Sequence, residues 1–176
     1  GLDPEKDLSI DQSIDFGATA AAFTGDDSAD FTVEFEPSAT ALEKQGAGYV
    51  VASLGVDSGY VPYTSYSART SYMEKNPDIM QKFTDALQKG MDFVQSHTPE
   101  EIAEIIEPQF PETDLDTITA IVKRYYDQDT WKSNLIFEKE SFELLEDILE
   151  DAGELKERVS YENLVTTEYA AKAAEK

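Results

Sequence analysis

A glutamate that is followed by a proline, Glu36-Pro37, carries the clearest candidate chemistry in the chain. A carboxylate accepts hydrogen bonds from amine and amide groups, so one held next to a rigid proline can bind a polar group of a small solute. The alternative is a solvated acid, or one that caps a helix beginning at Ser38. The residues leave both interpretations open, and each depends on the elements that position Glu36.

The segments around Glu36 have the pattern of a strand, a helix and a second strand. Apolar and polar residues alternate over residues 31–36, which is typical of a half-buried strand, and Pro37 ends it because proline donates no N–H. Residues 38–45 predict a short helix that ends at a glycine, and the apolar run 49–54 predicts a buried strand. Such a unit places a binding site at the carboxyl end of its strand, where Glu36 stands.

A second candidate site lies near the start of the chain, where residues 8–14 predict another strand. Phe16, Gly17 and Thr19 then open a short alanine-rich helix that ends at Gly25. The N-terminus of a helix offers unpaired N–H groups, which attract an anionic or polar ligand group. The alternative is an ordinary turn with a closely packed glycine.

Aromatic side chains form a third candidate group. Tyr60, Tyr63 and Tyr66 are spaced among small residues and are expected either to stack on a flat solute or to pack a hinge. Trp131 is expected to pack in a core. His97, which is the chain's one histidine, is expected at the end of a helix, where a positive group is favourable.

The sequence offers little for metal binding or catalysis. It has no cysteine and one histidine, and it lacks a phosphate-binding glycine loop and a nucleophile elbow. Asp127, Asp129 and Glu138 have partial calcium-loop spacing, but Lys132 replaces the required glycine. We therefore expect no metal site, no cofactor and no enzymatic activity.

Bulk composition restricts the partners. The 176 residues carry a net charge of −23, which opposes association with nucleic acid or an anionic membrane surface. Forty per cent hydrophobic residues, including nine Tyr and nine Phe, indicate a packed core. We therefore expect a folded chain whose partners are not nucleic acids.

The chain from Tyr66 onward is expected to be mainly helical. Asn76 and Pro77 open a long helix, and Thr98 to Glu101 form a capping box that opens a second. Apolar residues at helical spacing predict two more, with Leu115 to Tyr125 in one and Phe142 to Leu149 in the other. Residues 168–174 predict a short terminal helix.

Six motifs occur in an order that resembles a known family of receptors. They are Asp30 to Pro37, Gly55 to Thr64, Lys75-Asn76-Pro77-Asp78, Asp129-Thr130-Trp131, Ala152-Gly153-Glu154-Leu155 and Tyr161 to Ala170. Their order resembles the NMT1/THI5-like substrate-binding proteins of ABC importers, which bind thiamine pyrimidine precursors, sulfonates, nitrate or related molecules. The resemblance covers nearly the whole chain and corresponds to the carboxyl-terminal portion of such a receptor.

The resemblance implies an α/β, periplasmic-binding-protein-like (type II) fold. Residues 1–57 would complete lobe two as a βαβαβ unit, and residues 58–176 would return, mostly as helices, to lobe one. The solute would lie in the cleft between the lobes, bound by the candidates named above, which are Glu36, Phe16, Gly17, Thr19, Tyr60 and Tyr63.

The resemblance also implies partners and a location. The expected partners are a small-molecule solute, an ABC permease and the missing N-terminal half of the receptor, with self-association of the fragment. The expected location is extracytoplasmic, either free in the periplasm or lipid-anchored at the cell surface. Two alternatives remain, which are an acidic module that binds a basic protein and an enzyme of the pyrimidine-synthase type.

Overall fold

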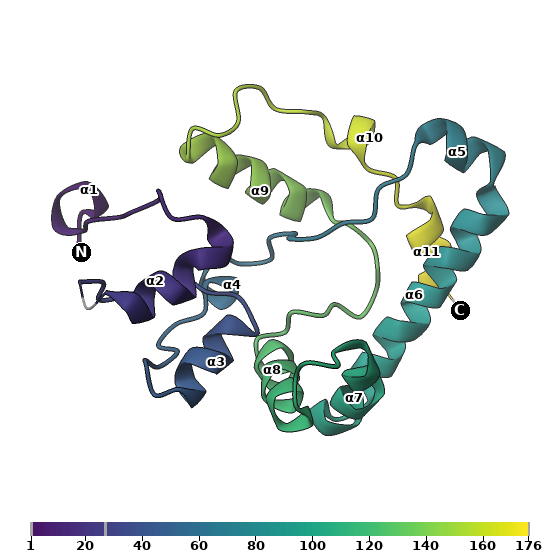
Figure 1. Cartoon of the computed structure of the whole chain (residues 1–176). Coiled ribbons are helices and arrows are strands. Elements are labelled where there is room, and N and C mark those ends of the chain that lie inside the picture. Colours follow the sequence, from purple (N-terminus) through teal and green to yellow (C-terminus); the bar gives the residue numbers. More distant parts are fainter. Residues whose placement is uncertain (1, 27, 176) are drawn as a thin grey trace. The chain divides into compact units, whose positions relative to one another are not determined.

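The computed structural model describes residues 2–26 and 28–175, and it divides into two compact units between Ala52 and Ser53. Gly1, the first residue of the expected segment 1–57, lies outside the described residues. The first unit contains α1 (Pro4–Asp7), η1 (Phe16–Ala18), α2 (Thr19–Gly25) and α3 (Ser38–Lys44). The second contains α4 (Leu54–Asp57), α5 (Thr70–Lys75), α6 (Pro77–Ser96), α7 (Pro99–Ile106), η2 (Glu107–Gln109), α8 (Leu115–Asp127), α9 (Lys139–Asp151), α10 (Tyr161–Leu164) and α11 (Glu168–Ala174), as Figure 1 shows.

The expected α/β fold is wrong for this structure, because no strand occurs in residues 2–26 or 28–175. The segments 8–14, 31–36 and 49–53, which carry the strand patterns, lie outside helices and form no sheet. Alternation describes the conformation of a single segment, whereas a sheet also requires a second segment to accept its backbone hydrogen bonds. The periplasmic-binding-protein-like architecture that depended on these strands is therefore absent.

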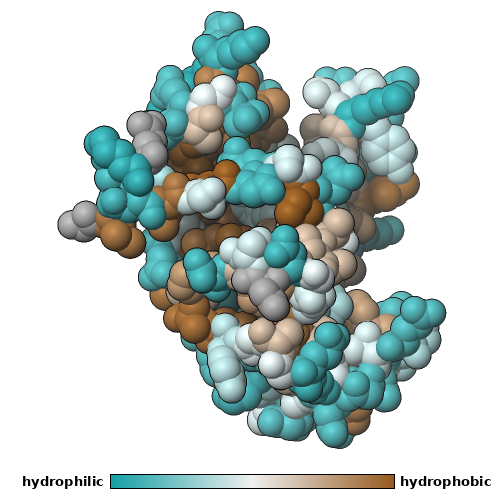
Figure 2. All heavy atoms as spheres, turned by 60° about the vertical axis from the view of Figure 1, so that its left-hand side comes forward, coloured by the Kyte–Doolittle hydropathy of each residue, from teal (hydrophilic) through white to brown (hydrophobic). Residues whose placement is uncertain are grey.

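The apolar side chains of these segments remain exposed. Phe31 is 78% exposed, Val33 is 62% exposed, and Tyr49 and Val51 are 88% and 75% exposed. Leu42 of α3 is the buried hydrophobic residue of this unit among those described. Figure 2 shows hydrophobic side chains standing among hydrophilic ones on the face that it draws. The first unit therefore has little hydrophobic core of its own.

The short helices of the first unit are confirmed. The helix α2 follows η1 and ends at Gly25, as the alanine-rich segment predicts. The helix α3 begins at Ser38 and ends at Lys44, and Gly46 then adopts a φ of 69°, which favours glycine.

The longer helices of the second unit are also confirmed, because their start and stop signals are local. Asn76 and Pro77 open α6, and the capping box opens α7, where the N–H of Glu101 donates to Oγ1 of Thr98 at 3.3 Å. In return the N–H of Thr98 donates to Oε2 of Glu101 at 2.9 Å. Both helices therefore begin where the sequence predicts, although Asn76 occupies the N-cap position of α6 without a side-chain capping bond.

The main hydrophobic core lies where α7 and α8 pack side by side near the end of α6 (Figure 1). Its buried residues are Ile102, Ala103, Ile118 and Val122. Trp131 packs against this core, as the sequence predicts. A second contact joins α11 to α6, where Ala170 and Ala173 are buried.

No helix within residues 2–26 or 28–175 is long and apolar enough to span a bilayer.

Candidate functional site

Glu36 acts as a cap in this structure. Its Oε2 accepts the N–H of Thr40 at 3.0 Å, and its Oε1 accepts the Thr40 hydroxyl at 3.0 Å. These bonds satisfy a donor in the first turn of α3, which is the capping role that the sequence also allows. Binding of a solute by Glu36 stays a prediction.

Phe16, Gly17 and Thr19 lie together at the junction of η1 and α2. The Phe16 ring makes an edge-to-face contact with Phe35, with 5.0 Å between their centroids, so this junction adjoins the segment that carries Glu36. The Thr19 hydroxyl donates to the carbonyl of Phe16 at 3.1 Å. A Cβ added at Gly17 would meet no atom within 4 Å, so close packing does not require this glycine.

Tyr60 and Tyr63 belong to the other unit and are 55% and 76% exposed. The Tyr60 hydroxyl donates to Oδ2 of Asp129, and this bond raises the pKa of Tyr60. Asp129 has a φ of 56°, which is uncommon for a residue other than glycine. Tyr66 packs edge-to-face on Phe83 at 5.2 Å. The binding role of Tyr60 and Tyr63 stays a prediction.

A cavity lies elsewhere in the second unit, between α9 and the segment that leads into α10. It has a volume of about 390 Å³, which is within the usual size of a small-molecule site. Its charged lining comprises Lys139, Glu143, Glu146, Asp147, Arg158 and Glu162, and its other lining residues are Phe142, Val159, Ser160 and Tyr161. Four carboxylates and two cations give the lining an excess of negative charge.

A turn of the backbone after α9 brings the two sides of this cavity together. The helix α9 ends at Asp151, and Gly153 follows with a φ of 75°, which lets the chain turn back along the helix. Phe142 contacts Tyr161 edge-to-face at 5.7 Å, and the Tyr161 hydroxyl donates to the carbonyl of Phe137. Burial, followed by the charge of Glu140, raises the pKa of Tyr161. The two rings therefore join the segment to α9.

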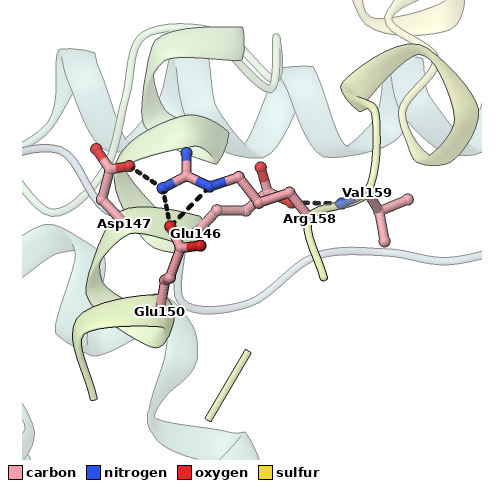
Figure 3. Close-up of polar contacts among 5 residues, drawn as sticks. All are labelled: Glu146, Asp147, Glu150, Arg158 and Val159. Atoms are coloured by element: carbon pink, nitrogen blue, oxygen red, sulfur yellow. Dashed lines mark hydrogen bonds and ion pairs between the residues drawn. The ribbon is translucent and has the colours of Figure 1, made fainter. Parts of the chain in front are cut away.

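Arg158 is held by two carboxylates of α9 (Figure 3). Its Nη2 donates to Oδ1 of Asp147 and to Oε2 of Glu150, each at 2.5 Å, and its Nε donates to the same Glu150 oxygen at 3.0 Å. These bonds raise the pKa of Arg158, with Glu150 the larger cause. The guanidinium is therefore committed to these two acids.

A second ion pair lines the same cavity. Lys139 Nζ lies 2.7 Å from Oε1 of Glu162, and the Ser160 hydroxyl donates to Oε2 of Glu162 at 3.0 Å. The bond from Lys139, with smaller contributions from the Glu162 N–H and Ser160, lowers the pKa of Glu162 from its ordinary 4.5 to about 2. The same pair raises the pKa of Lys139.

Glu146 is the buried acid of this cavity and is 8% exposed. Its Oε1 accepts the backbone N–H of Val159 at 2.8 Å, as Figure 3 shows. A carboxylate can accept several hydrogen bonds, so one partner leaves most of its capacity unused.

Sequence reasoning missed this cavity, although one signal was present. Glu146 follows Phe142 by four residues and so shares its face of the helix. A charged residue on an otherwise apolar face is uncommon and marks a position where a partner is needed. The sequence around Arg158 and Glu162 does not indicate their roles, because their partners lie on or next to α9 and become neighbours only when the chain folds back along that helix. Within residues 2–26 and 28–175, no group of three or more His, Asp or Glu residues could hold a metal ion.

Comparison with known proteins gives one informative similarity. The chain is 38% identical over 171 residues to a Bacillus subtilis (strain 168) protein named "Putative binding protein YtlA". The match covers 97% of this chain and 51% of that protein, so the chain spans about half the length of this curated relative. No protein-family model matches the chain, and no solved structure matches it.

Proposed function

We propose that the chain is part of a binding protein that holds a small molecule without transforming it. The observation that carries this proposal is the 38% identity over 171 residues to a protein named as a binding protein. The cavity beside α9 supports it, because its volume and its mixture of aromatic and hydrogen-bonding groups suit a small organic molecule.

The more specific proposal is the solute-binding component of an ABC importer that works outside the cytoplasmic membrane. Its support is the order of sequence motifs from Asp30 to Ala170. The candidate solutes are thiamine-precursor-like pyrimidines, sulfonates or similar molecules, and the partner would be the importer's permease. The cavity of the second unit offers carbon contacts from the rings of Phe142 and Tyr161 and a hydrogen-bond acceptor at Glu146, which suits amine-bearing pyrimidines rather than sulfonates.

A thermal-shift screen of this chain and of the Bacillus subtilis relative tests the proposal. The panel contains thiamine pyrimidines, alkyl sulfonates, taurine, nitrate and simple amines. A ligand that binds the native state raises its stability by RT ln(1 + [L]/Kd), so a solute should raise the midpoint temperature in proportion to its affinity. If neither folded protein responds to any compound in the panel, the proposed function is wrong.

A second candidate function is an acidic module that binds a basic protein. The net charge of −23 and the exposure of apolar side chains such as Phe31 and Tyr49 favour it. Binding of a basic amphipathic peptide should then weaken steeply as salt is raised, because screening removes the attraction between opposite charges. Peptide binding that does not depend on salt would contradict this second candidate.

A further inference from the structure

The cavity beside α9 has a carboxylate that its surroundings do not neutralise. Glu146 is 8% exposed, and its Oε1 accepts one hydrogen bond from Val159. Its other oxygen, Oε2, makes no hydrogen bond or ion pair with any of the described residues. Among the described residues, the buried side-chain atom without a partner is Oε1 of Gln88, so Oε2 of Glu146 is reached by solvent through the cavity. This oxygen is therefore free to accept a hydrogen bond from a bound molecule.

The two cations of the cavity lining bond to carboxylates other than Glu146. Arg158 donates to Asp147 and Glu150, and Lys139 pairs with Glu162. Four carboxylates against two cations leave the lining negative. An anionic ligand would add like charge to this lining, whereas a cationic ligand would compensate Glu146.

The apolar part of the cavity suits a ring or a short carbon chain attached to such a cation. Phe142 and Tyr161 meet edge-to-face at 5.7 Å and line the cavity beside Glu146. Lys139 Nζ already lies 6.0 Å from the Tyr161 ring centroid, so this ring accepts a positive charge over its face.

We propose that this cavity binds small organic ammonium ions, with Glu146 as the hydrogen-bond acceptor for the ligand's N–H groups. Phe142 and Tyr161 contact the ligand's carbon atoms. The ion pairs of Arg158 and Lys139 position the segment 158–162 against α9 and so form the wall of the site. This inference rests on the proposed binding function and adds the chemical class of the ligand.

The test uses three probes of nearly equal size, which are benzylamine, benzyl alcohol and benzoate. Each is titrated into the ¹⁵N-labelled chain, and the backbone amide signals of Val159 and Ser160 report binding, because Val159 donates to Glu146. Benzylamine should shift these signals and saturate. Benzyl alcohol should bind more weakly, and benzoate should leave the signals unchanged.

Two variants, each of which removes one negative charge, distinguish direct contact between Glu146 and the ligand from the general effect of charge on binding. Glu146→Gln keeps the side-chain shape and the acceptor for Val159, and it should weaken benzylamine binding at least about tenfold, as expected for a hydrogen bond to a charged group. Asp151→Asn changes an exposed position at the end of α9 outside the cavity lining and should change affinity less than about twofold. Circular dichroism confirms that both variants keep their helices.

Three results would overturn the proposed ligand class. They are equal binding of benzoate and benzylamine, equal losses in the two variants, and benzylamine shifts that occur away from Val159 and Ser160. If a neutral or anionic solute binds this cavity while benzylamine does not, the ligand class is wrong and the binding function stands. If no probe and no compound of the solute panel binds either protein, both proposals are wrong.

Discussion

The backbone N–H of Val159 donates to Oε1 of Glu146 across 2.8 Å and thirteen positions of the chain. This bond joins α9 to the segment that returns along it, and it fixes one oxygen of the buried acid. The cavity that we propose as the binding site lies between the elements that this bond connects.

Loss of the Glu146 acceptor should destabilise the chain. Glu146→Ala removes the acceptor of the Val159 N–H, and because Val159 is 41% exposed, water can replace that acceptor, so the loss should be roughly 0.5–1.5 kcal/mol of unfolding free energy. Glu146→Gln retains an acceptor and should cost less. Urea unfolding measures both, with Glu140→Ala on the same helix as a control that makes no such bond. Equal stability of the Ala and Gln variants would contradict this role of the acceptor.

The ion pair between Lys139 and Glu162 should disappear in acid. The pKa of Glu162 is lowered from 4.5 to about 2 in the folded chain, so its ionised form favours folding. This contribution is complete above pH 4.5 and is lost as the pH falls toward 2. We expect the stability difference between the unmodified chain and Glu162→Gln to shrink over that interval. A carboxyl carbon NMR signal of Glu162 that titrates near 4.5 would refute the lowered pKa.

The core between α7 and α8 should be sensitive to the loss of methyl groups. Ile102 is 3% exposed, so Ile102→Ala should lower the free energy of unfolding by roughly 2–5 kcal/mol. Ile105 lies on the same helix but is 65% exposed, so Ile105→Ala should change it by less than about 1 kcal/mol. Chemical denaturation of both variants makes the comparison, and similar losses would show that α7 does not pack through Ile102.

The exposed apolar residues of the first unit should cause self-association. Phe31 and Tyr49 are 78% and 88% exposed, and contact between copies would remove their surface from water. The net charge of −23 opposes this contact, so association should increase with salt as repulsion is screened.

Sedimentation velocity at low and high salt measures this association. The double variant Phe31→Ser/Tyr49→Ser should sediment more nearly as a monomer. Tyr72→Ser, which changes an exposed tyrosine of the second unit, serves as the matched control. A monomer at every salt concentration would be the contrary result.

Helices were predictable here because their signals lie close together in the chain. Thr98 and Glu101 cap α7 from within one turn, and the glycines at 46 and 153 follow the ends of α3 and α9. The strands were not predictable in the same way, since Phe31 and Val33 show the right alternation but sheet formation depends on a separate segment.

The sequence by itself determined where most helices begin and end, the acidic character of the chain and the packing role of Trp131. The tertiary structure alone decided that Glu146, Arg158 and Tyr161 line one cavity, whereas the cap that Glu36 makes on Thr40 was one of two roles that the sequence already allowed. The physical reason is the separation along the chain between the residues that interact. Caps and helical faces arise from residues within a few positions of each other, whereas the cavity forms because the chain after Gly153 returns to α9 and brings distant residues into contact.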